Sequence, residues 1–264
     1  MTSDELSFVR DLTQEVGDLL RRGFGEVRQV QTKTSHVDLL TEYDLRSEEL
    51  ILKRIADHDP DAAVLAEESG HHGDGERIWM VDPIDGTTNF AHGLPIFCVS
   101  IALVEAGQPT VGAVFAPLLN ELFTAVRGQG AYLNGDPLEV SGIATVEQSL
   151  VVTGFPYGIE TRRDNNIAYF ETFSVRAQAV RRLGSAALDL CYVAAGRLDG
   201  YWEIETMPWD CSAGALLVQE AGGRVTDLEG QPLRFGQPTS VLATNDRVHA
   251  EMLDLMRQTD AAQA

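Results

Sequence analysis

The sequence predicts a mixed α/β protein of 264 residues, and three observations support that class. Two amphipathic helical patterns come first, a run of short apolar segments separated by turn signals follows, and strands then alternate with helices. The hydrophobic fraction of 44% is typical of a globular protein with a sizeable core. We place a boundary after Val140, between an N-terminal α+β subdomain (1–140) and a C-terminal α/β subdomain (141–264).

The first helix is predicted over residues 4–22, because five apolar side chains fall on one face. They are Val9, Leu12, Val16, Leu19 and Leu20. Residues 23–37 are mostly polar and lack clear periodicity, and the later part, 31–35, is expected to form a loop around Lys33. A second helix is predicted over residues 38–56, entered near Thr41, with Asp44 in its first turn, where the helix dipole favours a carboxylate. Its inward face is expected to carry Leu45, Ile51, Leu52 and Ile55.

Two predicted buried strands end in acidic residues. The apolar run 62–66 is followed by Glu67 and Glu68, and the apolar run 78–81 is followed by Asp82. Strand ends are where α/β sheets present their chemistry. One acidic strand end is common, but two of them make a shared metal site a reasonable hypothesis.

The second of these strands runs into the stretch Asp82-Pro83-Ile84-Asp85-Gly86-Thr87-Thr88-Asn89-Phe90. At this spacing Asp82 and Asp85 repel each other unless a cation lies between them. Gly86 allows a tight turn, and a helix beginning at Thr87 would present backbone N–H groups to an anion. Asp85-Gly86 alone is more typical of a helix cap and a turn. The whole stretch indicates a phosphate ester held against a divalent metal.

The later elements follow from turn signals and periodicity. Strands over 97–105, 110–115, 121–126 and 131–133 are expected to form an antiparallel meander, and Asn134-Gly135 is a strong hairpin signal. Further strands are predicted over 150–153, 198–204, 223–226 and 241–244. Helices are predicted over 165–179, 186–195, 208–221 and 246–258, with Asp210 as the candidate N-cap of the third.

Charge and cysteine content limit the possible partners and compartments. The net charge is −20, from 40 acidic and 20 basic residues, so the surface as a whole should repel nucleic acid and anionic membranes. Three widely spaced cysteines argue against a disulfide framework and fit a reducing cytoplasm. The acidic N-terminus lacks the apolar core of a signal peptide, and no run approaches the roughly 20 apolar residues of a membrane span.

Four segments, in order along the chain, together resemble the inositol monophosphatase family, within the lithium-sensitive, magnesium-dependent phosphatases. They are Lys33-Thr34-Ser35-His36-Val37-Asp38-Leu39-Leu40-Thr41-Glu42-Tyr43-Asp44, Ala66-Glu67-Glu68-Ser69, the Asp82 to Phe90 stretch, and Trp209-Asp210 through Glu220-Ala221-Gly222-Gly223. The ending Thr88-Asn89-Phe90 is similar to that of the inositol monophosphatase branch. The resemblance implies a layered α/β/α/β/α sandwich, a homodimer and a small phosphate-ester substrate.

The resemblance also implies the metal site. Glu67, Asp82 and the carbonyl of Ile84 match the ligands of one Mg²⁺, and Asp82, Asp85 and Asp210 match those of a second. A weaker third ion is sometimes placed near Glu67, so two or three ions are expected. All these ligands are oxygens, as Mg²⁺ requires.

The expected chemistry is direct in-line attack by a metal-activated water, without a phosphoenzyme. The Thr87 hydroxyl, paired with Asp44, matches the pair that orients this water in the family. Glu67, as a ligand of the first ion, completes the expected catalytic set.

The implied substrate contacts comprise a phosphate cradle and a polyol site. Glu203, shortly before Asp210, matches the glutamate that contacts inositol, although it could equally be a surface acid at a strand end. Lys33 matches a lysine of a mobile loop near the site. The full set of expected substrate contacts is Asp85, Gly86, Thr87, Gly184, Ser185, Ala186, Glu203 and Asp210.

The function expected from the resemblance is magnesium-dependent hydrolysis of myo-inositol monophosphate to inositol and phosphate. The loop Phe155-Pro156-Tyr157-Gly158 departs from the animal enzymes, so fructose 1,6-bisphosphate, histidinol phosphate and adenosine 3′,5′-bisphosphate stay open as substrates. Some bacterial family members also act as partners of the transcription machinery in antitermination. The net charge of −20 argues against direct RNA binding but not against a protein partner.

Overall fold

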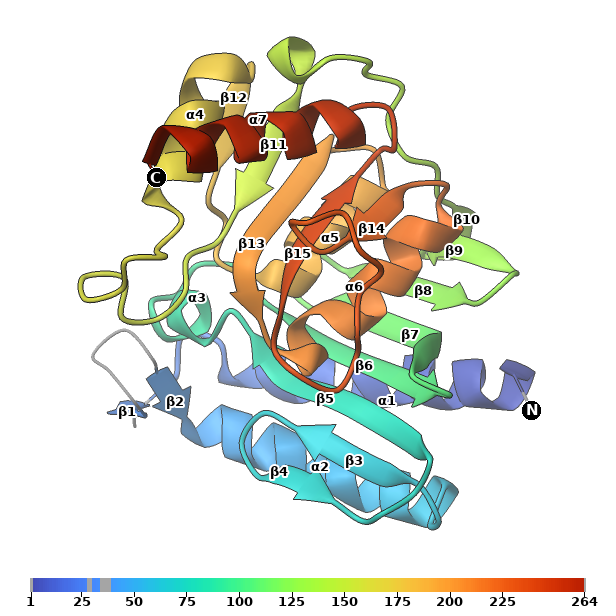
Figure 1. Ribbon diagram of the computed structural model, residues 1–264. Coiled ribbons are helices and arrows are strands. Elements are labelled where there is room, and N and C mark those ends of the chain that lie inside the picture. Colours follow the sequence, from blue (N-terminus) through green and yellow to red (C-terminus); the bar gives the residue numbers. More distant parts are fainter. Residues whose placement is uncertain (1, 28–29, 34–38, 264) are drawn as a thin grey trace.

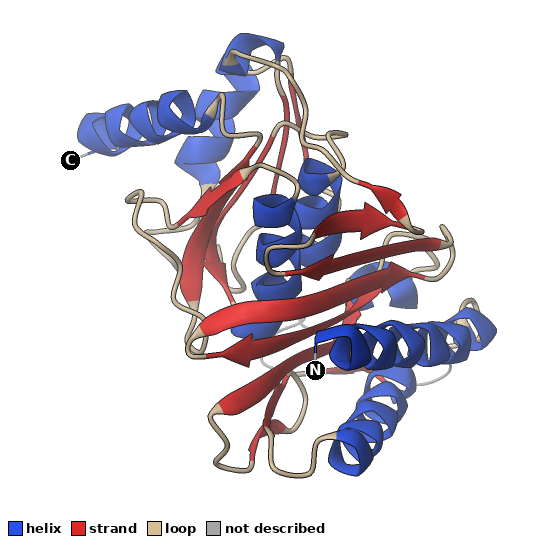
Figure 2. Ribbon diagram, turned by 90° about the vertical axis from the view of Figure 1, so that its right-hand side faces the viewer, coloured by secondary structure: helices blue, strands red, loops and turns tan. Residues whose placement is uncertain are grey.

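Five layers of helices and sheets stack on one another in the computed structural model, which describes residues 2–27, 30–33 and 39–263. Helices α1 (Thr2–Gly23) and α2 (Glu42–His58) cover one face of an eight-stranded sheet. Helices α5 (Ala186–Ala194) and α6 (Pro208–Glu220) fill the space between this sheet and a five-stranded sheet. Helices α4 (Ile167–Arg176) and α7 (His249–Gln263) cover the outer face of the smaller sheet (Figure 2). The predicted α/β/α/β/α sandwich is confirmed.

The eight-stranded sheet has the order β10-β9-β8-β7-β6-β5-β3-β4. Its strands are β3 (Ala63–Ala66), β4 (Gly70–His72), β5 (Arg77–Asp85), β6 (Cys98–Glu105), β7 (Gln108–Ala116), β8 (Glu121–Val126), β9 (Gly130–Leu133) and β10 (Asp136–Pro137). Strands β3 and β5 pair in parallel, and the other neighbours pair antiparallel. The predicted meander is therefore correct, and Asn134 (φ 52°) and Gly135 (φ 90°) form the turn between β9 and β10.

The five-stranded sheet has the order β12-β11-β13-β15-β14. Its strands are β11 (Leu150–Thr153), β12 (Ala179–Arg181), β13 (Gly200–Thr206), β14 (Arg224–Thr226) and β15 (Thr239–Thr244). A separate pair, β1 (Val30–Thr32) and β2 (Leu39–Thr41), leads into α2 (Figure 1). The short elements are α3 (Thr87–Ala91) and a 3-10 turn (Val146–Gln148). A division of the chain at residue 140 stays a prediction.

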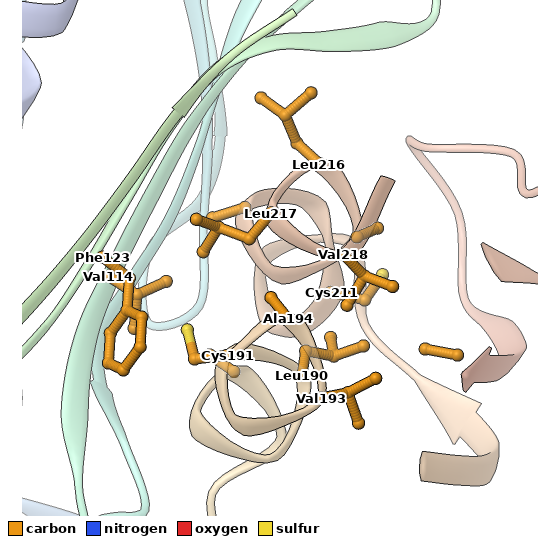
Figure 3. Close-up of a cluster of buried hydrophobic side chains, with 14 of the residues drawn as sticks. Val114, Phe123, Leu190, Cys191, Val193, Ala194, Cys211, Leu216, Leu217 and Val218 are labelled. Carbon is orange, nitrogen blue, oxygen red and sulfur yellow. The ribbon is translucent and has the colours of Figure 1, made fainter. Parts of the chain in front are cut away.

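The largest apolar cluster lies between the two sheets. Leu190 and Val193 of α5 pack with Leu217 and Val218 of α6, and the cluster reaches Phe123 of the large sheet (Figure 3). Both helices are almost entirely buried, which explains why they are apolar around most of their circumference. Among the described residues, no helix is long and apolar enough to cross a membrane.

Helix α2 departs from its predicted orientation. The prediction that Leu45 points inward is wrong, because this side chain is 50% exposed. Asp44, Ser47 and Glu48 are buried instead, at 3% exposure or less. The first turns of α2 therefore face a polar site, and apolar periodicity describes only its later turns, where Ile51 and Ile55 are buried.

Other differences concern element boundaries. Gln31 and Thr32 of the predicted loop 31–35 belong to strand β1. Residues 28–29 and 34–38, which include part of the first family-like motif, lie outside the described residues. The predicted helix 165–179 is shorter and is followed by β12. The N-cap of α6 is Met207 rather than Asp210, which is the third helical residue.

A buried histidine couples the small sheet to pH. His249 is 1% exposed, and its two ring nitrogens lie 3.0 Å from the hydroxyls of Thr226 and Thr244. Burial, with the nearby charge of Arg224, lowers the pKa of His249 from 6.5 to about 4. The folded protein therefore keeps this ring neutral at a pH where the unfolded chain takes up a proton.

We predict that His249 makes the free energy of unfolding fall as the pH drops from about 6.5 to about 4. Only the unfolded state takes up this proton between the two pKa values. The uptake stabilises the unfolded state relative to the folded protein by about 1–2 kcal/mol, after allowance for solvent screening. The measurement compares urea unfolding of the wild type and His249→Gln across this range. Buried acids with raised pKa values act in the opposite direction in both proteins, so the difference isolates the histidine. Parallel pH profiles for the two proteins would contradict the prediction.

Candidate active site

The candidate site lies where strand ends meet the starts of several helices. The last residues of β3 and β5 come together with the first turns of α2, α3, α5 and α6, near the end of β13 (Figure 1). Unpaired backbone N–H groups and the helix dipole make helix starts favourable for negative charge. The site can therefore hold both carboxylates and an anionic ligand.

Pairing of β3 with β5 brings the two predicted acidic strand ends together. Ala66 pairs with Val81 in the parallel register, and the N–H of Glu67 donates to the carbonyl of Val81 at 3.1 Å. Glu67 therefore lies beside Asp82. The register of β5 against β6 shifts between Asp82 and Asp85, which is a β-bulge around Pro83, a residue without a backbone donor. At the strand end, the bulge changes the directions in which the Asp82 and Asp85 side chains point.

Asp44 and Thr87, which the resemblance implies as a water-orienting pair, are joined by a hydrogen bond. Thr87 Oγ1 lies 2.9 Å from Asp44 Oδ1 and 3.0 Å from the Ile84 carbonyl, so its single proton has two acceptors. The N–H and hydroxyl of Thr41 both donate to Asp44 Oδ2, at 2.7 and 2.6 Å. Burial raises the pKa of Asp44 to about 6, and the donors of Thr41 and Thr87 oppose this rise. Gly86, directly before α3, has φ 97°, a left-handed conformation that favours glycine.

The start of α5 holds the carboxylate of Asp85. Ser185 Oγ and the N–H of Ala187 donate to Asp85 Oδ2 at 2.6 and 2.7 Å, and the N–H of Ala186 donates to Oδ1 at 3.3 Å. Burial raises the pKa of Asp85, and these donors limit the rise. We expected Ser185 and Ala186 only as substrate contacts, and the structure gives both a direct contact with Asp85. The first-turn N–H of Ala187 was missed, and a helix starting after Gly184 was the signal that could have revealed it.

Lys33 neutralises the other acidic strand end. Its Nζ donates to Glu67 Oε1 at 2.8 Å and to Glu68 Oε1 at 2.6 Å. These side chains are only 6–21% exposed, so the pairing is partly shielded from water. Burial and the charge of Glu67 raise the pKa of Glu68 to about 7. Glu68 is not among the residues that we predicted for the site.

Asp82 is the electrostatic centre of the site. It is 2% exposed, and its Oδ1 accepts the N–H of Ile84 at 2.9 Å. Burial raises its pKa well above the usual value, and the charges of Glu67, Asp85 and Asp210 raise it further. Four carboxylates, from the end of β3, from β5 and from α6, therefore repel one another. Asp210 Oδ2 is held by the N–H of Met207 at 2.8 Å.

The chemistry of this set fits a hard divalent cation. Carboxylate and carbonyl oxygens are the ligands that Mg²⁺ uses, and a cation removes the repulsion that raises the pKa of Asp82. In the part of the chain that the structure describes, no three His, Cys, Asp or Glu side chains are arranged closely enough to form a ligand cluster. Each carboxylate is held instead by a protein donor, such as Lys33, Ser185 or the N–H of Met207. Assignment of the individual ligands stays a proposal.

Glu203 approaches the same site from β13. Its Oε2 accepts the hydroxyl of Tyr201 at 2.7 Å. Burial raises the pKa of Glu203 to about 7, the Tyr201 hydroxyl opposes this, and the charge of Asp85 adds to it. The charge of Glu203 in turn raises the pKa of Asp210. A surface acid would show neither effect, so Glu203 belongs electrostatically to the site. Gly184 borders it, and its carbonyl faces Gly86.

Comparisons with known proteins agree with this geometry. Residues 2–261 match the model of the inositol monophosphatase family. An inositol-1-monophosphatase of Synechocystis sp. is 47% identical over 238 residues, covering 89% of this chain and 83% of the relative. A Nus factor SuhB of Pasteurella multocida is 42% identical over 220 residues, with 82% of each chain covered. The solved inositol monophosphatase of Anabaena (Nostoc) sp. superposes with a TM-score of 0.88 at 40% identity, covering 97% of this chain and 96% of that one.

We predict that Asp82→Asn stabilises the metal-free protein. The asparagine removes one charge from the cluster, keeps an oxygen for the N–H of Ile84, and adds a donor toward Glu67. We expect a gain of about 1–2 kcal/mol, and each kcal/mol raises the Tm by about 2–4 °C. Thermal unfolding in EDTA measures this directly.

The same variant should lose the stabilisation that Mg²⁺ gives the wild type, since a ligand that binds only the folded state raises the Tm. Asp136→Asn, at an exposed position of β10, is the matched control and should respond to Mg²⁺ as the wild type does. A lower Tm for Asp82→Asn in EDTA, or an equal Mg²⁺ response in all three proteins, would contradict the proposed role of this carboxylate.

Proposed function

The chain belongs to the inositol monophosphatase family and is a phosphatase, and we propose that it hydrolyses myo-inositol monophosphate to inositol and phosphate in a magnesium-dependent reaction. The single observation that carries the proposal is the hydrogen bond between Thr87 Oγ1 and Asp44 Oδ1, at 2.9 Å, directly after the Asp82–Asp85 bulge. If Thr87 served only to begin α3, it would not need the buried Asp44 from the distant helix α2. A proton acceptor next to the proposed metal ligands suits hydrolysis of a phosphate ester.

The family is metal-dependent, and we propose two or three Mg²⁺ ions for this chain. Glu67, Asp82 and the carbonyl of Ile84 would hold one ion, and Asp82, Asp85 and Asp210 a second. When bound, the metal lowers the pKa of a water molecule and stabilises negative charge on the leaving oxygen. An aspartate suits position 82 because both carboxylate oxygens can then serve as ligands.

The residues around the cluster orient the nucleophile and move its proton. The hydroxyl oxygen of Thr87 has lone pairs left to accept a hydrogen bond from water, while its own proton points to Asp44 Oδ1. Asp44, with a pKa of about 6, is ionised at neutral pH and can accept this proton. The first-turn N–H groups of α3, after Gly86, would bind the phosphate, as backbone donors at helix starts do. Attack in line with the leaving oxygen then needs no protein nucleophile.

Glu203 is proposed to accept hydrogen bonds from two hydroxyl groups of the polyol. Its position between Asp85 and Tyr201 supports this role. Gly184 would line the same side of the substrate, with Ser185 and Ala186 shared between the substrate and Asp85. Inhibition by lithium, a homodimer and a cytoplasmic location remain proposals from the family resemblance, and a small phosphate ester is the substrate class that fits.

We predict magnesium-dependent phosphate release that is greatest with inositol 1-phosphate. The comparison panel contains fructose 1,6-bisphosphate, histidinol phosphate, adenosine 3′,5′-bisphosphate and glycerol 2-phosphate. EDTA and Asp85→Asn should each lower kcat/KM by at least about a hundredfold, because the cation loses its ligand set. Asp136→Asn is the control and should retain activity. A better ester than inositol 1-phosphate would reassign the substrate, and no release from any ester by folded protein with Mg²⁺ would overturn the phosphatase reading.

A second candidate role is a protein partner of the transcription machinery, which the printed name of the Pasteurella multocida relative favours. The role does not need catalysis, and the net charge of −20 does not argue against a protein partner. If it applies, RNA polymerase should be retained equally by the wild type and by catalytically inactive Asp82→Asn in a pull-down. Absence of polymerase from both would reject this candidate and leave the hydrolytic function unaffected.

A further inference from the structure

A buried hydrogen-bond cluster at the base of the loop 154–165 has no part in the mechanism above. At its centre is Asn166, which is 4% exposed and has a left-handed backbone with φ 68°. Its Nδ2 donates to Thr153 Oγ1 at 2.8 Å and to the carbonyl of Gly154 at 2.6 Å. Its Oδ1 accepts the indole N–H of Trp202 at 2.7 Å. We call Thr153, Asn166 and Trp202 the loop clasp.

The loop clasp joins the end of β11, the start of α4 and the middle of β13. Thr153 is the register partner of Trp202, and its Oγ1 also donates to the carbonyl of Trp202 at 2.6 Å. The Trp202 side chain is fully buried, with its ring 4.5 Å from that of Phe173. Every polar group of this network has a partner, so it holds one arrangement of the three elements.

Glu203 follows Trp202 directly, and its side chain therefore points to the opposite face of β13. There it occupies the space that a side chain at position 154 would take, because a Cβ built on Gly154 would lie 1.3 Å from Glu203 Oε1. Gly154 does not have the left-handed φ that favours glycine. A glycine is needed here only because its missing side chain leaves room for Glu203. The hydroxyl of Tyr201 holds the other carboxylate oxygen.

The Glu203 carboxylate lies near the proposed metal ligands, because the charge of Asp85 raises its pKa and its own charge raises the pKa of Asp210. The side-chain amide of Asn166 bonds within the loop clasp and to the carbonyl of Gly154, and Gly154 adjoins Glu203 Oε1. Substitutions at these positions can therefore move Glu203 without removing a hydrogen bond of a proposed metal ligand.

We infer that Gly154 and the loop clasp are positioning residues that set the place of the Glu203 carboxylate and hence the discrimination between polyol phosphates and simpler phosphate esters. This inference rests on the proposed function, since it assigns no new substrate. A carboxylate already fixed in place loses little side-chain entropy when two hydroxyls bind to it. Displacement by one or two ångströms weakens both hydrogen bonds and leaves the metal chemistry intact.

The test is Gly154→Ala, since the added methyl group must push the Glu203 carboxylate aside. We expect the KM for inositol 1-phosphate to rise about tenfold with kcat changed less than about twofold, and the KM for glycerol 2-phosphate to change less than about twofold. Affinity for Mg²⁺ by isothermal titration should stay at the wild-type value. Asn166→Gly keeps the left-handed backbone and removes the clasp amide, so it should shift the two KM values in the same selective way.

Two control variants carry the same types of substitution, Gly to Ala and Asn to Gly, at other positions of the chain. Gly142→Ala places a methyl group where no atom lies within 4 Å, and Asn120→Gly changes another left-handed asparagine at an exposed turn. Both should behave as wild type, and Tm values check that every variant is folded. Glu203→Gln is the reference for full loss of polyol discrimination. A crystal structure of Gly154→Ala should show a displaced Glu203 carboxylate.

The outcomes distinguish this inference from the proposed function. If Glu203→Gln loses the preference for inositol 1-phosphate while Gly154→Ala and Asn166→Gly keep it, the positioning role is wrong and the function stands. An unmoved Glu203 carboxylate in Gly154→Ala leads to the same conclusion. Wild-type protein without preference for inositol 1-phosphate overturns the proposed substrate, and this inference with it.

Discussion

Repulsion among carboxylates at one edge of the large sheet is the constraint on which the rest of the site depends. Asp82 is nearly fully buried and feels the charges of Glu67, Asp85 and Asp210. A stable fold has to offset this repulsion before any metal binds, because an unpaired buried charge is costly. Each of the four carboxylates accordingly accepts a hydrogen bond from a neighbouring protein donor, and the donors come from four separate stretches of the chain.

This distribution of donors explains why catalysis requires the whole layered fold. The bulged end of β5 supplies Asp85, and the start of α5, about 100 residues later, supplies the donors that hold it. Apolar packing of α5 and α6 between the two sheets sets the distance between these groups (Figure 3). A substitution such as Leu190 to a smaller residue therefore acts on the site through packing, although it touches no polar group.

The residues proposed for chemistry and those proposed for recognition come from different sheets. The proposed metal ligands and the Thr87–Asp44 pair lie at the end of the large sheet and at helix starts, whereas Glu203, the proposed polyol contact, comes from the small sheet, next in sequence to the Trp202 that Asn166 binds. Recognition can change in this arrangement without loss of the hydrolytic chemistry.

The sequence by itself determined most of the helices and strands and the two acidic strand ends, because turn residues, apolar periodicity and the run from Asp82 to Thr87 are local features of the chain. It did not determine which neighbours these residues have. The outward position of Leu45, the contact of Ser185 with Asp85 and the space that Gly154 leaves for Glu203 depend on strand register and helix packing. Only the tertiary structure decides such contacts, since they join residues that are 49 to 100 positions apart, and no local pattern encodes their distance.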